Sequence, residues 1–184
     1  MKNALLLLGI TLMVTLSGPK VMGQTATNNL SLGMPEVLLV KSNASSINLT
    51  LSPQEAGLAV QPSLSDSTAR VLISSVVSGE QTRTLNASVT SGTIPAGTYL
   101  KLIAMSPNSS FVGTAGTLGA QVELGAVAQN IVTGIGTCYS GTAADDGYRL
   151  KYTFGIPAAT GTYGSIRATA GAAVTVTLTL SAGS

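Results

Sequence analysis

The feature that most constrains the fold of this chain is a two-residue alternation of apolar and polar side chains. It is clearest near the C-terminus, where the apolar residues from Val174 to Leu180 alternate with threonines. Successive side chains of a strand point to opposite faces of a sheet, so this pattern predicts a half-buried strand with one polar face. The pattern recurs over 47–52 and 150–156. No window has the period of a convincing amphipathic helix.

Further segments have the composition of strands and are mostly separated by turn-forming residues. Glycine and asparagine supply positive φ in these turns, and proline presets others. Strands at this spacing predict an all-β antiparallel sandwich of about seven to nine strands. The further candidate strands are 36–41, 70–77, 82–89, 99–105, 120–124 and 129–133.

The N-terminus has the three-part pattern of a secretory signal peptide. A basic Lys2 precedes an apolar run over 4–16, and small residues follow, including Val21 and Gly23. We expect cleavage after Gly23, which leaves residues 24–184 as a single domain with a mobile arm over 24–32. The alternative is a buried N-terminal helix. Cleavage would place the protein outside the cell or on its surface.

The charge balance of the processed chain excludes some classes of partner. The full sequence has nine basic and seven acidic residues, and Lys2 and Lys20 lie in the predicted leader. The processed chain is therefore neutral and has no basic block for nucleic acid or an anionic membrane. No later apolar stretch reaches the length of about 20 residues that a transmembrane helix needs, so we expect no membrane span.

The residue types available argue against an enzyme. The chain has no histidine, and its seven acidic residues are scattered. Histidine is the commonest general base, so a Ser-His-Asp or Cys-His hydrolase is excluded. We therefore expect no enzymatic activity and no cofactor. Cys138 is the single cysteine, which rules out an internal disulfide; we expect it to be buried and inert, with intermolecular pairing as the alternative.

One adjacent acidic pair is a candidate metal site. Asp145 and Asp146 precede Gly147, and carboxylates with loop carbonyls are the ligands that calcium prefers. The segment lacks the further acids of an EF-hand loop. The pattern favours instead a hairpin turn with Asp146 and Gly147 at its tip.

Tyrosines are the main aromatic residues and the candidates for ligand binding. Tyr139, Tyr148 and Tyr163 fall near predicted loops, where they could line a shallow binding surface. The alternative is that they lie at the rim of the sandwich. Tyr152 falls on the apolar face of a predicted strand, so we expect it in the core.

Three stretches together resemble a group of secreted bacterial β-sandwich proteins. They are 35–39, the segment 135–141 with the strand after Gly147, and the alternating C-terminal strand. The resemblance covers nearly all of the processed chain. It implies a bacterial envelope or extracellular origin and an immunoglobulin-like topology, but no established activity.

The C-terminal segment also resembles pilins that assemble by strand donation. Gly171 precedes the alternating final strand, as in chaperone-assembled pilins. The chain departs from that family at Gly183, where the family has tyrosine, and it lacks the cysteine pair. These departures argue against assembly by that chaperone pathway and leave strand exchange by another route open.

These features predict a structural or adhesive protein of the bacterial surface. Either terminus could supply a strand to a neighbour, and the alternative is that both pair within their own sandwich. We expect self-association into a filament, such as a pilus or fimbrium, or a layer, or contacts with other surface subunits. The alternative is a monomeric module that binds a carbohydrate or another surface through the tyrosine loops and a calcium site.

Overall fold

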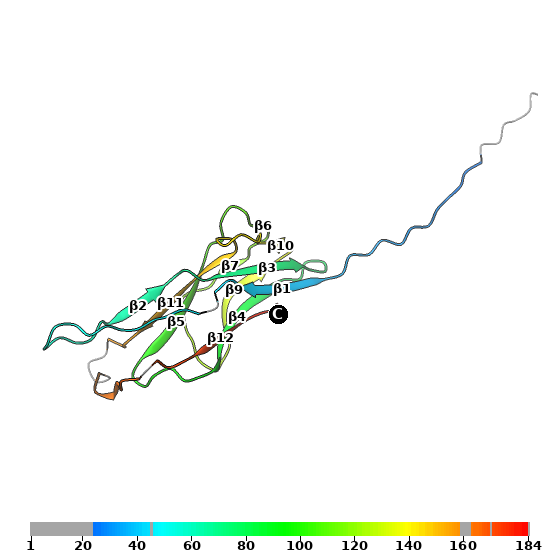
Figure 1. Ribbon diagram of the computed structural model, residues 1–184. Coiled ribbons are helices and arrows are strands. Elements are labelled where there is room, and N and C mark those ends of the chain that lie inside the picture. Colours follow the sequence, from blue (N-terminus) through cyan, green and yellow to red (C-terminus); the bar gives the residue numbers. More distant parts are fainter. Residues whose placement is uncertain (1–23, 45, 159–162, 170, 184) are drawn as a thin grey trace, which may run out of the picture. The chain divides into compact units, whose positions relative to one another are not determined.

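The computed structural model describes residues 24–44, 46–158, 163–169 and 171–183 (Figure 1). The predicted signal peptide and its cleavage site lie outside these residues, so secretion stays a prediction. The chain divides into two units, one ending at Gly33 and one beginning at Met34. In the first unit, the described residues 24–33 form no helix and no strand. The sandwich lies in the second unit.

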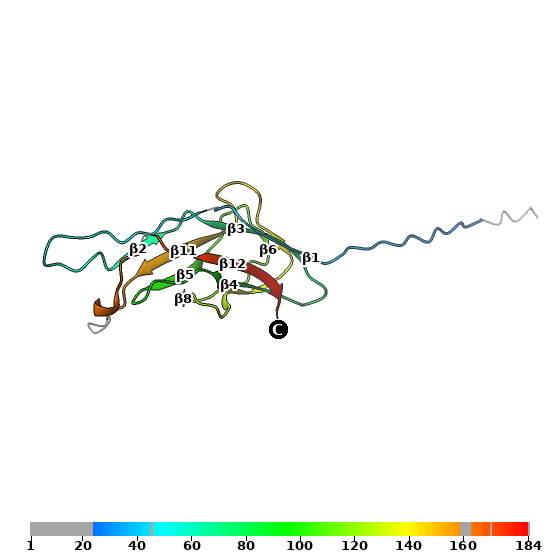
Figure 2. The same ribbon diagram turned by 60° about the horizontal axis from the view of Figure 1, so that its bottom comes forward.

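The second unit contains two antiparallel sheets, which confirms the predicted all-β sandwich (Figure 2). Beyond the strands, the described residues contain one short 3-10 helix, η1 (Tyr163–Ser165). The larger sheet is formed by β1 (Val37–Ser42), β2 (Ser63–Asp66), β3 (Arg70–Val76), β5 (Tyr99–Met105), β6 (Val112–Gly113), β8 (Val122–Glu123), β10 (Cys138–Tyr139) and β11 (Tyr148–Gly155). The smaller sheet is formed by β4 (Arg83–Ser91), β7 (Thr117–Leu118), β9 (Gln129–Ile135) and β12 (Thr175–Ala182).

The pairing order determines which strands lie at the edges. In the larger sheet the order is β6-β10-β3-β11-β5-β8, with β1 added beside β3 and β2 beside β11. In the smaller sheet the order is β12-β4-β9-β7. Among the described residues, β1 pairs only with β3 and β12 pairs only with β4. Both are therefore edge strands.

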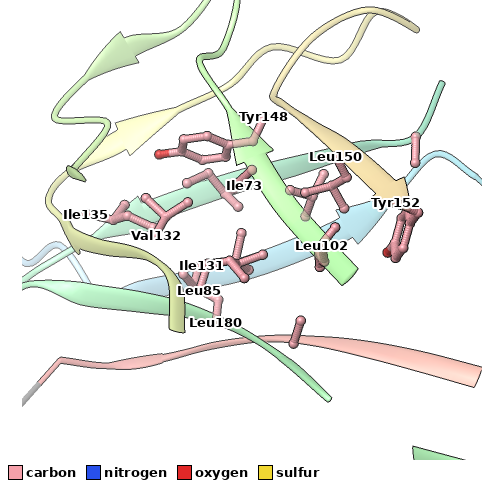
Figure 3. Packing of buried hydrophobic residues seen from close by; sticks show 14 of the residues in the cluster. Ile73, Leu85, Leu102, Ile131, Val132, Ile135, Tyr148, Leu150, Tyr152 and Leu180 are labelled. Carbon is pink, nitrogen blue, oxygen red and sulfur yellow. The ribbon is translucent and has the colours of Figure 1, made fainter. Parts of the chain in front are cut away.

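The core lies between the sheets and follows the two-residue alternation. In β3 the inward Val71 and Ile73 are buried while their neighbours are half-exposed. Tyr152 is buried, as predicted. Figure 3 shows the side chains of the two sheets meeting, and the labelled residues are Ile73, Leu102, Tyr148, Leu150 and Tyr152 from the larger sheet and Leu85, Ile131, Val132, Ile135 and Leu180 from the smaller one.

The structure corrects the strand predicted over 47–52. Ile47, Leu49 and Leu51 are half-buried and alternate with exposed residues, but this segment is not assigned as a strand. Alternation reports which side chains face the interior, whereas a strand also needs a backbone partner. Conversely, β6, β7 and β10 are two-residue strands, too short for a periodic signal. No helix in the described part of the chain has the length and apolarity to cross a bilayer.

Candidate functional site: an open groove between the sheets

A groove of about 990 Å³ lies at one end of the sandwich in the second unit. Its inner wall is formed by the end of β11 and the start of β5, and its opposite wall by residues leading into and along β12. A third side is formed by residues 46–51. The apolar side chains that line it include Ile47, Leu49, Leu51, Leu100, Phe154, Val174, Val176 and Leu178.

The groove stays open because one of its sides has no strand partner. Within the described residues, no backbone hydrogen bond joins 46–51 to a neighbouring strand. The nearest such bond runs from the Gln61 amide to the Ser52 carbonyl at 3.0 Å. Residues 46–51 therefore present apolar side chains to the groove and unpaired backbone groups along it, which is the chemistry of an incomplete sheet.

The charges around the groove are of one sign. Its described lining includes Lys41 and Arg167 and no acidic residue. The Arg167 guanidinium donates hydrogen bonds of 2.8 Å to the carbonyls of Gly164 and Ile166. The Val60 amide donates to the Tyr163 hydroxyl at 3.1 Å. These bonds fix η1 and the following turn beside the groove.

The acidic pair does not converge on a shared metal position. Asp146 is buried, whereas Asp145 is exposed. The Asp146 carboxylate accepts hydrogen bonds from the Ser110 hydroxyl, from the Asn108 amide at 2.9 Å and from the Ala143 backbone amide at 2.7 Å. These bonds, that from Ser110 first, lower the pKa of Asp146 below its ordinary value. Among the described residues, no three acidic, histidine or cysteine side chains cluster in a way that could hold a metal.

The segment that carries this pair is a loop, and not the predicted hairpin. β10 and β11 both pair with β3, at Ser75 and Val71 respectively, so they do not pair with each other. Gly147 has φ of 79° and lies so close to the Val71 carbonyl that a Cβ atom would be 2.2 Å from that oxygen. Glycine is required there for both reasons. The Asp146 carboxylate therefore holds this loop together through the hydrogen bonds it accepts. Its calcium role stays a prediction.

The three candidate tyrosines lie in different environments. The prediction that Tyr148 lies at a surface loop is wrong, because its side chain is fully buried. Its hydroxyl donates a hydrogen bond to the Ala115 carbonyl, and its ring packs edge-on against Phe111 with 5.4 Å between ring centroids. Its backbone lies at the start of β11, in phase with the core. Tyr139 is 54% exposed in β10, and Tyr163 is 45% exposed in η1. Only Tyr163 lines the groove, so the structure does not bring the three together.

One buried residue was missed from the sequence and another was predicted. Arg83 is buried in β4, and its guanidinium forms an ion pair with the Glu36 carboxylate at 2.5 Å, just before β1. The alternation phase places Arg83 on the same face as Leu85, which was the available signal. Cys138 is buried as predicted, and burial raises the pKa of its thiol to about 11.

Comparison of this chain with protein families, with characterised proteins and with solved structures gives no match. The function must therefore be argued from the groove and the edge strands.

Proposed function

We propose that the protein is a structural or adhesive subunit of the bacterial surface, and that copies of it assemble into a filament or layer through β-strand contacts. The observation that carries this proposal is the groove. It combines a row of apolar side chains with a segment, residues 46–51, whose backbone has no strand partner among the described residues. An extended peptide added to such an edge gains main-chain hydrogen bonds, and its alternate side chains gain apolar pockets.

The edge strands of the two sheets, β1 and β12, lie beside each other and support the same proposal. β1 and β12 are edge strands and carry few charges: the single charged residue within either is Lys41. Proteins that remain monomeric commonly protect their edges with charge, proline or a covering segment. The apolar side chains of β1 include Leu38 and Leu39, which are 45% and 62% exposed. Sparse charge and exposed apolar residues at an edge favour strand-to-strand association.

The test of this function is the assembly state of the secreted protein, purified in its processed form. Static light scattering over a range of concentrations and negative-stain electron microscopy should show elongated or sheet-like homopolymers. We expect Leu49→Lys to reduce assembly at least about tenfold, because a buried unpaired charge in an apolar groove is costly. The matched control is Val127→Lys, in a loop outside the groove where Val127 is 73% exposed. A strictly monomeric unsubstituted protein at high concentration would contradict the proposal.

A further inference from the structure

We propose that the groove of one molecule is filled by residues 29–34 of a second copy, which lie along residues 46–51 as an added strand. This inference rests on the proposed function, because it names the segment that makes the contact between subunits.

The side-chain pattern of this segment matches the groove. Leu30, Leu32 and Met34 are spaced by two residues, and their exposed fractions are 76%, 89% and 82%. In an extended conformation all three side chains point to one face. Residues 46–51 turn their own apolar side chains to the groove with the same period. An added strand would therefore bury three large apolar side chains that are otherwise exposed to water, which favours association.

The two segments also match in length and charge. Each has six residues, which corresponds to about 20 Å of extended chain. The unpaired N–H and C=O groups of 46–51 would gain partners from the added backbone. Residues 24–35 contain no charged side chain, so the added strand brings no buried charge into the apolar groove.

The point where the donor segment joins the second unit, and the place of the groove in that unit, favour a second copy. The chain enters β1 at Val37, which pairs with Val76, and the Glu36–Arg83 ion pair holds this entry. The groove instead begins at the other end of β1, where Ser42 pairs with Val71. The donor segment joins one end of β1 and the groove that accepts it lies at the other end. Contacts of this kind run head to tail, and they can repeat from one copy to the next without closing into a ring.

Occupation by the same molecule would require the chain to reverse just before β1. Met34 precedes Pro35, and a residue before proline is restricted to extended conformations. This restriction suits Met34 to the end of an extended donor segment. The two origins of the strand are distinguished directly by mixing differently labelled molecules.

The first experiment uses two single-cysteine variants of the processed protein, both in a Cys138→Ala background. One carries Leu32→Cys in the donor segment and the other carries Leu49→Cys in the groove. Under mild oxidation, the mixture should form a disulfide-linked dimer that contains one copy of each, as read by mass spectrometry and non-reducing electrophoresis. Pairing Leu32→Cys with Val127→Cys is the control and should give at least about tenfold less. Absence of the mixed dimer, with efficient intramolecular cross-linking in a Leu32→Cys/Leu49→Cys double variant, would overturn the inference.

The second experiment separates this inference from the proposed function. Leu30→Asp/Leu32→Asp should reduce assembly at least about tenfold in light scattering, whereas Thr27→Asp adds charge outside the proposed segment and should not. Unchanged circular dichroism and thermal unfolding would show that the sandwich remains folded. Assembly that persists in the double variant overturns the choice of donor and leaves the proposed function standing. Absence of assembly by the unsubstituted protein overturns both.

Discussion

The sandwich has a groove at one end and is closed at the other, here called the closed end. Both ends have the same alternation of apolar and polar side chains, but they differ in how deeply the apolar side chains are buried. At the closed end, Leu85, Ile131 and Leu150 are almost fully buried between the sheets. At the groove end, Leu49, Phe154 and Val176 are apolar and face inward, yet they remain only half-buried. The difference is a missing backbone partner and not a missing apolar pattern. The closed end therefore stabilises the fold, and the groove end retains apolar surface for a contact.

The largest expected effect comes from truncating a fully buried core side chain. Leu102 is fully buried, so we expect Leu102→Ala to lower the free energy of unfolding by about 2–5 kcal/mol, through lost burial and the cavity left behind. Leu49→Ala at the groove is the matched control and should cost less than about 1 kcal/mol in the monomer. Urea unfolding at concentrations where the protein is monomeric measures both. Equal losses would show that the groove end is packed as tightly as the core.

A smaller effect is expected from the ion pair that holds the start of β1. Arg83 is buried and Glu36 is half-exposed, so solvent screens part of the interaction. Glu36→Gln should lower the free energy of unfolding by about 1–2 kcal/mol, because it weakens the charged partner of a buried guanidinium. Glu80→Gln, in an exposed turn, serves as the control for removing one negative charge. If the two variants are equally stable, the ion pair does not stabilise the closed end.

The hydrogen bonds that the Asp146 carboxylate accepts predict that the stability of the fold depends modestly on pH, and only at acid pH. Hydrogen bonds from Ser110 and Asn108 lower the pKa of Asp146 in the folded protein, whereas in the unfolded chain it titrates near about 3.9. A depressed folded pKa gives stability that is present above the unfolded value and is lost as the pH falls through the folded value. Asp146→Asn should therefore lower the Tm at pH 7 and reduce the loss of stability below about pH 4.

Thermal unfolding between pH 2 and 7 measures this dependence, and Asp145→Asn is the matched control because Asp145 is exposed. If Asp146→Asn retains the full acid sensitivity of the unsubstituted protein, the depressed pKa of Asp146 is not its source.

The sequence predicted the fold class because alternation and turn residues are local signals. Strand β5 (Tyr99–Met105) has the predicted bounds, and β3 differs from its prediction by one residue. Pairing depends on contacts between distant segments, so the absence of a ladder at 46–51 could not be predicted. The groove has the same origin, because it exists where that ladder is missing. The inward position of Tyr148 follows the phase of β11, but the residue was assigned to a loop because the start of that strand was placed two residues too late.

The smallest structural change is the one needed to measure the alkylation rates of two thiols. One thiol is that of Cys138, and the other is introduced at Leu49 in the groove, so the two rates compare the two ends of the sandwich. Cys138 is buried away from the groove, and burial raises the pKa of its thiol to about 11, so the reactive thiolate is scarce at pH 8. We expect native Cys138 to react with a water-soluble alkylating reagent far more slowly than after unfolding in urea. In a Cys138→Ala background, Leu49→Cys should react quickly in the monomer and become protected on assembly, since its side chain faces the open groove. Rapid native labelling of Cys138 would show that the closed end opens as readily as the groove.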